Sequence, residues 1–123
     1  MILGLRTAIY YVNDMDKAKE WYSTVLGFKP YFDEPYYVGF NVGGYELGLS
    51  PGKPAMLEQD SGVIVYWGVE KAETAFKRLI ELGATTHNDL QDVGSGIIVA
   101  TVVDPFGNIF GIIENPHFSL EKK

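Results

Sequence analysis

The stretch Asp104-Pro105-Phe106-Gly107-Asn108, followed by the apolar residues 109–113, decides the fold of this chain. Proline presets φ for the second position of a turn, and Gly and Asn close turns because they tolerate positive φ. The flanking residues 97–103 and 109–114 are apolar and largely β-branched, which is typical of strands. The last third of the chain is therefore predicted to be a β-hairpin.

Outward from this hairpin, the chain reads as two similar halves, each with a strand, a helix and then further strands. An offset of 57 residues lays Val12 on Val69 and Ala18 on Ala75. In the first half we expect strands at 5–12, 29–32, 36–42 and 45–49 and a helix at 15–26. In the second half we expect strands at 63–69, 85–88, 97–103 and 109–114 and a helix at 72–82.

Local signals mark the ends of these elements. Asp14 or Asn13 is the expected N-cap of the first helix, and Gly27 is expected to end it. Gly43-Gly44 is the expected two-residue hairpin turn, and Gly83 is expected to stop the second helix. The predicted fold class is α+β with two βαβββ modules. We expect a single domain over residues 1–123, with module one at 1–50, a linker at 51–60, module two at 61–114 and a polar tail at 115–123.

Composition excludes several classes of protein. The chain has 123 residues, 46% of them hydrophobic, which suits one globular domain with a real core. It has no cysteine, so disulfides and thiol catalysis are excluded. No apolar run approaches the roughly 20 residues that span a bilayer, and no secretory signal is evident; we expect a cytoplasmic protein without a membrane partner. The net charge is −6 with scattered basic residues, so nucleic acid is not an expected partner.

The motifs together resemble one family. Val12-Asn13-Asp14-Met15-Asp16-Lys17-Ala18, followed by Val25-Leu26-Gly27-Phe28, is similar to the opening strand-to-helix signature of the vicinal oxygen chelate superfamily, and Asp104-Pro105-Phe106-Gly107-Asn108 to its final hairpin. The superfamily includes glyoxalase I, bleomycin-resistance proteins and extradiol dioxygenases. The resemblance implies two modules that form a curled, barrel-like mixed sheet around a pocket, and a homodimer. It also implies metal ligands on the first and last strand of each module.

The residues at those ligand positions do not favour a metal. By the resemblance they are Thr7 and Ile64 on the first strands, Gly111 on the last strand of module two, and Gly48 or Glu46 on that of module one. Divalent metals of this chemistry need three or more His or carboxylate groups. We therefore expect no metal and no cofactor.

Strand parity supplies a candidate lining for the pocket, because side chains two positions apart share a face. The predicted ligand-binding residues are Thr7, Ile9, Tyr37, Glu46, Gly48, Ile64, Tyr66, Thr101, Gly111 and Ile113. The glycines are expected to leave room for a ligand, and the wall is expected to be apolar and aromatic. For each residue the alternative is ordinary packing in a curved sheet.

No catalytic residue is assigned from the sequence. Glu46 and Glu114 are expected to face solvent, although an inward Glu46 could act as a base or bind a cation. His87 and His117 are expected to be solvated, and residues 33–35 to form a loop. Three functions stay open: a small-molecule binding protein for an aromatic or cationic compound, resembling the bleomycin-resistance branch; a metal-dependent lyase, isomerase or dioxygenase with ligands such as Glu46, Glu114 and His87; and a non-catalytic structural or regulatory module.

Overall fold

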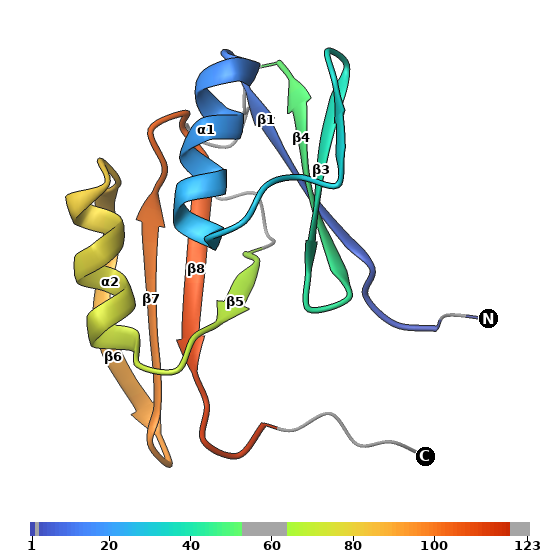
Figure 1. Ribbon diagram of the computed structural model, residues 1–123. Coiled ribbons are helices and arrows are strands. Elements are labelled where there is room, and N and C mark those ends of the chain that lie inside the picture. Colours follow the sequence, from blue (N-terminus) through green and yellow to red (C-terminus); the bar gives the residue numbers. More distant parts are fainter. Residues whose placement is uncertain (2, 53–63, 119–123) are drawn as a thin grey trace. The chain divides into compact units, whose positions relative to one another are not determined.

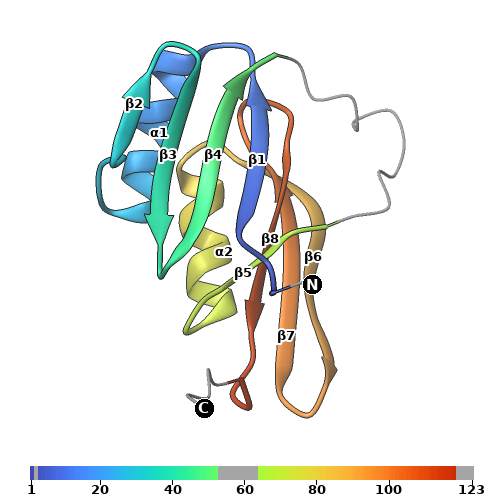
Figure 2. The same ribbon diagram turned by 90° about the vertical axis from the view of Figure 1, so that its right-hand side faces the viewer.

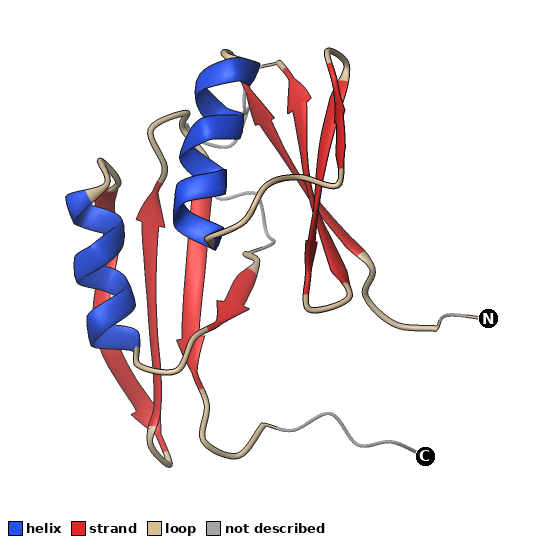
Figure 3. Cartoon of the chain, in the orientation of Figure 1, coloured by secondary structure: helices blue, strands red, loops and turns tan. Residues whose placement is uncertain are grey.

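The computed structural model describes residues 1, 3–52 and 64–118. These residues form two compact units, each with one helix and a four-stranded sheet (Figures 1 and 3). The first unit holds the described residues up to 52 together with 106–108, and the second holds 64–105 and 109–118. The expected α+β class is confirmed. Neither helix in this part of the chain is long and apolar enough to cross a membrane.

The first unit follows the order β1 (Thr7–Val12), α1 (Met15–Leu26), β2 (Phe32–Glu34), β3 (Tyr37–Val42) and β4 (Tyr45–Pro51). Its sheet has the strand order β1-β4-β3-β2, in which β1 and β4 are parallel and the other pairs antiparallel. Figure 2 shows this sheet from the side opposite α1. We call it the first sheet.

The second unit repeats this plan with β5 (Tyr66–Gly68), α2 (Ala72–Glu81), β6 (Thr85–Gly94), β7 (Ile97–Val103) and β8 (Ile109–Glu114). Its strands, the second sheet, follow the order β5-β8-β7-β6, again with one parallel and two antiparallel pairs. Element for element, this is the topology of the first unit. The βαβββ repeat predicted from the sequence is therefore confirmed.

Each sheet buries one face beneath its own helix. In the first unit, Ala18 and Tyr22 of α1 are fully buried, and the Tyr22 ring stacks on Tyr10 of β1 at 5.9 Å between centroids. Alternate residues of the strands complete this core: Val12, Val38, Phe40, Leu47 and Leu49. In the second unit, the core comprises Ala72, Leu79, Ala84, Ala100, Val102, Phe110 and Ile112. Burial of a large aliphatic or aromatic side chain contributes roughly 1.5–3 kcal/mol, so the helix-covered face of each sheet supplies much of the stability of its unit.

The expected ends of α1 are confirmed. The Asp14 side chain accepts a hydrogen bond from the Lys17 backbone N–H at 3.0 Å, as an N-cap does. Gly27 has φ of 85°, and its N–H donates to the Ser23 carbonyl. A residue with a Cβ would be strained at this left-handed position, so glycine ends the helix there.

The two predicted turns also form. Gly43 and Gly44 both have positive φ and join β3 to β4, as the two-residue turn requires. Asp104 and Asn108 at the ends of the β7–β8 turn are buried. The Asn108 side-chain amide donates to the Tyr11 carbonyl at 2.9 Å.

Several expected strand bounds were wrong. β2 covers residues 32–34 rather than 29–32, so Asp33 and Glu34 are paired with β3 and do not form a loop. β6 extends to Gly94, six residues past its expected end, through three irregularities in its pairing with β7. The described part of the strand expected at 63–69 is shorter, at Tyr66–Gly68. Residues 53–60 of the expected linker, residue 63 and residues 119–123 of the tail lie outside the described part of the chain.

Candidate functional site

Five predicted site residues meet on the face of the first sheet that is turned away from α1, which we call the open face of that sheet. Thr7 pairs with Glu46, and Ile9 pairs with Gly48, so all four share this face. Tyr37 of β3 reaches the same place, because its hydroxyl lies over Gly48. Thr7 and Ile9 are exposed, and Glu46 and Tyr37 are half-buried.

The room over Gly48 is filled, contrary to the expectation that glycine leaves it vacant. A Cβ at Gly48 would lie 2.6 Å from Tyr37 Cζ and closer still to its hydroxyl. Gly39, which pairs with Gly48, similarly has the rings of Tyr31 and Tyr37 within 3.3 Å of where its Cβ would be. Two adjacent glycines thus make a flat floor on which the tyrosine side chains lie.

Glu46 is held by two tyrosines. The Tyr31 hydroxyl donates to Glu46 Oε1, and the Tyr37 hydroxyl donates to Oε2. Glu46 was expected to face solvent, but its carboxylate is held by these two hydrogen bonds. Burial and the hydrogen bond to Glu46 raise the pKa of Tyr37 above its usual range, and the bond to Glu46 raises the pKa of Tyr31. Both phenols stay protonated at neutral pH, so the carboxylate is fixed in place by neutral donors.

Tyr31 was not predicted as a site residue. It precedes β2, and its backbone N–H donates to the Gly39 carbonyl at 3.0 Å, which sets the ring beside Glu46. Its aromatic neighbours Phe32, Tyr36 and Tyr37 were the available signal in the sequence. Because the strand was predicted at 29–32, Tyr31 was placed inside a strand and its proximity to Glu46 was not recognised.

In the second unit, three predicted residues form one row across the face of the second sheet that is turned away from α2. Tyr66 pairs with Gly111, and Gly111 pairs with Thr101. Again a tyrosine covers the glycine: a Cβ at Gly111 would lie 2.7 Å from both Tyr66 Cδ1 and the Val65 carbonyl oxygen. Ile113, two residues along β8, shares this face and is half-buried. Ile64 precedes β5 and is exposed.

His87 is exposed, as expected, but it also contacts the site row. Its Nδ1 lies 2.8 Å from Oγ1 of Thr101, a residue only 2% exposed. The irregular pairing of β6, which the sequence did not predict, brings His87 to this position. The other histidine, His117, is exposed, and its Nε2 donates to the Ser95 carbonyl at 2.8 Å.

Glu114 acts on the opposite face of the second sheet. Its Oε1 accepts a hydrogen bond from the Ala72 backbone N–H at 2.8 Å, so it caps α2 from β8. Lys71, at the N-cap position, makes no such bond. Glu114 was expected to face solvent, but it is half-buried. Its role is structural.

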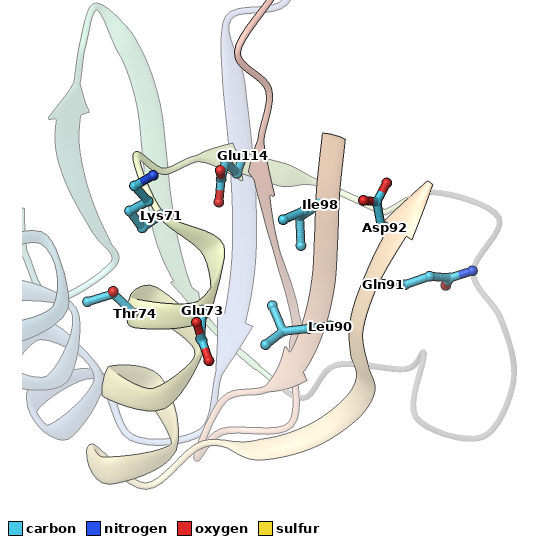
Figure 4. A pocket seen from close by; sticks show the side chains of 8 residues that line it. All are labelled: Lys71, Glu73, Thr74, Leu90, Gln91, Asp92, Ile98 and Glu114. Atoms are coloured by element: carbon cyan, nitrogen blue, oxygen red, sulfur yellow. The ribbon is translucent and has the colours of Figure 1, made fainter. Parts of the chain in front are cut away.

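A hollow of ≈ 450 Å³ lies beside this cap (Figure 4). Its lining comes from α2, β6, β7 and β8: Lys71, Glu73, Thr74, Leu90, Gln91, Asp92, Ile98 and Glu114. Leu90 and Ile98 supply apolar surface, and the charged side chains surround them. None of the ten predicted ligand-binding residues lines this hollow, and Glu114 is the one candidate metal ligand that does.

The residues present do not fit the metal that the superfamily resemblance implies. By the resemblance, the ligand positions hold Thr7, Ile64, Gly111 and either Gly48 or Glu46, and both glycines are covered by tyrosine rings. At most one of these positions, that of Glu46, offers a metal-binding side chain. Among the described residues, no three His, Asp or Glu side chains gather into a group that could hold a metal ion. His87 and Glu114 lie on opposite faces of the second sheet, so these two residues cannot share one ion.

Comparison with known proteins identifies the family. Residues 4–112 match the model of the Glyoxalase/Bleomycin resistance protein/Dioxygenase superfamily. This chain belongs to that superfamily. No curated protein matches it in sequence.

Solved structures share the fold at low sequence identity. A glyoxalase-related enzyme from Fulvimarina pelagi is 18% identical with a TM-score of 0.76, over 98% of this chain and 94% of that one. Lactoylglutathione lyase from Agrobacterium tumefaciens is 18% identical with a TM-score of 0.72, over 98% and 100%. TioX from Micromonospora sp. ML1 is 22% identical with a TM-score of 0.69, over 90% and 98%. These similarities support the fold and do not transfer an activity.

Proposed function

We propose that this chain is a small-molecule binding protein that works without a metal and takes an aromatic or cationic compound. One observation carries the proposal. At the positions where the superfamily resemblance places metal ligands, the chain has at most one metal-binding side chain, that of Glu46, and tyrosines occupy the room over both glycines. One carboxylate does not make the set of three or more ligands that would hold a metal to polarise a substrate. On the first sheet, the Glu46 carboxylate is instead held in a fixed position among the aromatic rings of Tyr31 and Tyr37, and such a surface is suited to binding a ligand.

The first test is a thermal melt of chelator-treated protein with nickel, zinc, manganese and ferrous ions, each added separately. A ligand of the native state at about 100 times its dissociation constant adds roughly 2.7 kcal/mol to the free energy of unfolding. We expect no ion to shift the melting temperature, while a library of planar aromatic and cationic compounds contains some that do. A shift with one ion that disappears in Glu46→Gln would overturn the proposal in favour of the metal-dependent lyase or dioxygenase alternative.

A second candidate is a non-catalytic structural or regulatory module. It is favoured by the tyrosines over Gly48 and Gly111, because a surface that is filled by its own side chains needs no ligand. The two candidates differ in one result. If no compound in the library shifts the melting temperature, and Tyr37→Ala creates no new binding, the structural role is preferred.

The expected homodimer and cytoplasmic location stay predictions. Sedimentation equilibrium of the purified chain tests the first. Fractionation of the cells that produce the protein tests the second.

A further inference from the structure

Four aromatic side chains gather beside Glu46 in the first unit, with Phe32 at their centre. The Phe32 ring centroid lies 6.5 Å from that of Tyr31, 6.2 Å from that of Tyr36 and 6.2 Å from that of Tyr37. The planes of these ring pairs are inclined by 53–68°. Phe32 pairs with Gly39, which places it on the open face of the first sheet. We call these four residues the aromatic cluster.

The aromatic cluster is accessible. Tyr31 is 64% exposed, Tyr36 is 65% exposed and Phe32 is 37% exposed. Large aromatic side chains lose hydrophobic stabilisation when they stay in water, and a contiguous exposed patch of them is typical of a binding surface. Because the rings are inclined to one another, their faces do not all stack together and some remain available to a ligand.

The charge beside the cluster is negative and is not balanced by a side chain. Within the described part of the chain, no Lys, Arg or His nitrogen lies within 4 Å of the Glu46 carboxylate. Its two hydrogen-bond partners, the hydroxyls of Tyr31 and Tyr37, are neutral donors. They orient the carboxylate without cancelling its charge. A cation at the aromatic cluster would therefore meet both this charge and the negative ring faces.

The hydrogen bonding selects among cations. Both hydroxyls nearest the carboxylate already donate to Glu46, and a phenol that donates has only its weak acceptor capacity left. A metal ion or a primary ammonium needs several good oxygen acceptors to replace its water. An ammonium that carries methyl groups holds its water weakly and is bound well by ring faces.

We propose that the aromatic cluster and Glu46 bind the quaternary or N-methylated ammonium group of an organic cation. This inference rests on the proposed function, since it names the ligand class of the same open face. It adds a definite requirement: the positive charge and its methyl groups, rather than a planar ring system, are the part that the protein recognises.

The test uses a pair of probes of equal shape. Choline carries the trimethylammonium group, and 3,3-dimethylbutan-1-ol is its uncharged isostere. Binding of each to the full chain is followed by NMR titration, with attention to the aromatic signals. We expect choline to bind at least about tenfold more tightly than the alcohol, which corresponds to the upper part of the range for cation–π attraction.

Two variants and one control assign the site. Glu46→Gln keeps the hydrogen-bond acceptor and removes the charge, and Phe32→Leu keeps an apolar side chain and removes the ring; each is expected to weaken choline binding about tenfold. Glu73→Gln removes one negative charge from the exposed surface of α2 and should leave the affinity unchanged. Circular dichroism melts confirm that the variants are folded.

Equal binding of choline and the alcohol, or no binding of either, overturns the ammonium proposal. So does a loss of affinity in Glu73→Gln as large as that in Glu46→Gln, because the attraction would then come from the net charge of −6 alone. If choline fails while uncharged planar compounds still raise the melting temperature, the proposed binding function stands and only the ligand class is wrong.

Discussion

At the scale of single residues, Gly48 is where one methyl group has a large expected effect. Its backbone does not need glycine, since its φ is not in the left-handed region, so the cost of a side chain there is steric. A Cβ would overlap the hydroxyl and the ring of Tyr37, and the ring must move away from Glu46. We predict that Gly48→Ala lowers the free energy of unfolding by about 1–3 kcal/mol, measured by urea denaturation.

The matched experiment repeats this substitution where Tyr37 is already truncated. In a Tyr37→Ala background the new methyl group has space, so Gly48→Ala should cost far less than in the wild-type chain. If the cost is the same in both backgrounds, the tyrosine does not occupy the room over Gly48, and the steric explanation fails.

The raised pKa of Tyr37 leads to a prediction for how the stability of the chain responds to alkaline pH. Burial and the hydrogen bond to Glu46 raise the pKa of Tyr37 in the folded chain, while the pKa of a tyrosine in the unfolded chain is about 10. The contribution to stability is therefore complete below about pH 10 and decreases as the pH rises above it, because the unfolded state loses its proton first. Urea denaturation from about pH 9 to 11 should show a shallower decline for Tyr37→Phe than for the wild type. Parallel pH profiles would contradict the assignment.

At the scale of elements, α2 depends on a cap from a distant strand. The Ala72 N–H donates to Glu114 of β8, and Lys71 offers no side-chain cap of its own. We predict that Glu114→Ala destabilises the chain by about 0.5–2 kcal/mol, with faster amide exchange in the first turn of α2. Glu114→Gln retains an acceptor oxygen and should recover much of this loss. Equal destabilisation by both substitutions would mean that the charge at the helix N-terminus, and not the hydrogen bond, supplies the stabilisation.

The elements that could be predicted from the sequence are those defined by local signals. The caps and the turn Gly43-Gly44 act within a few residues. Gly27 and the turn were located correctly, and the N-cap was narrowed to Asn13 or Asp14, of which Asp14 is the cap. The predicted position of β2 was wrong because Phe32–Glu34 becomes a strand only through its pairing with β3, a tertiary contact. The predicted range of β6 was too short because its exposed polar residues lack the apolar–polar alternation that indicates a strand.

The candidate site was predictable to the level of sheet faces and no further. Strand parity places Thr7, Ile9 and Gly48 on one face, since side chains alternate strictly along a strand. The position of the Tyr37 ring over Gly48 depends on a side-chain rotamer and on the acceptor that Glu46 supplies, neither of which has a signature in the sequence. The contact of His87 with Thr101 depends on irregular pairing in β6.

At the scale of the whole molecule, one side chain joins segments that are far apart in sequence. Asn108, which follows the turn after β7, donates its side-chain amide to the Tyr11 carbonyl near the end of β1, 97 positions away. Asn108 is buried, so its removal leaves a partly buried acceptor without this donor. We predict that Asn108→Ala lowers the free energy of unfolding by about 1–3 kcal/mol.

Asn115→Ala is the matched control for this prediction. Its side chain also makes a hydrogen bond, accepting from the His117 backbone N–H at 2.9 Å, but the two residues are only two positions apart in the chain and the bond is exposed. A local bond of this kind closes no long loop, so its loss should change the midpoint of urea denaturation little. If Asn108→Ala and Asn115→Ala have equal effects, the long-range bond does not stabilise the fold. The local conformation of the turn, set by residues such as Pro105 and Gly107, would then be sufficient for the hairpin.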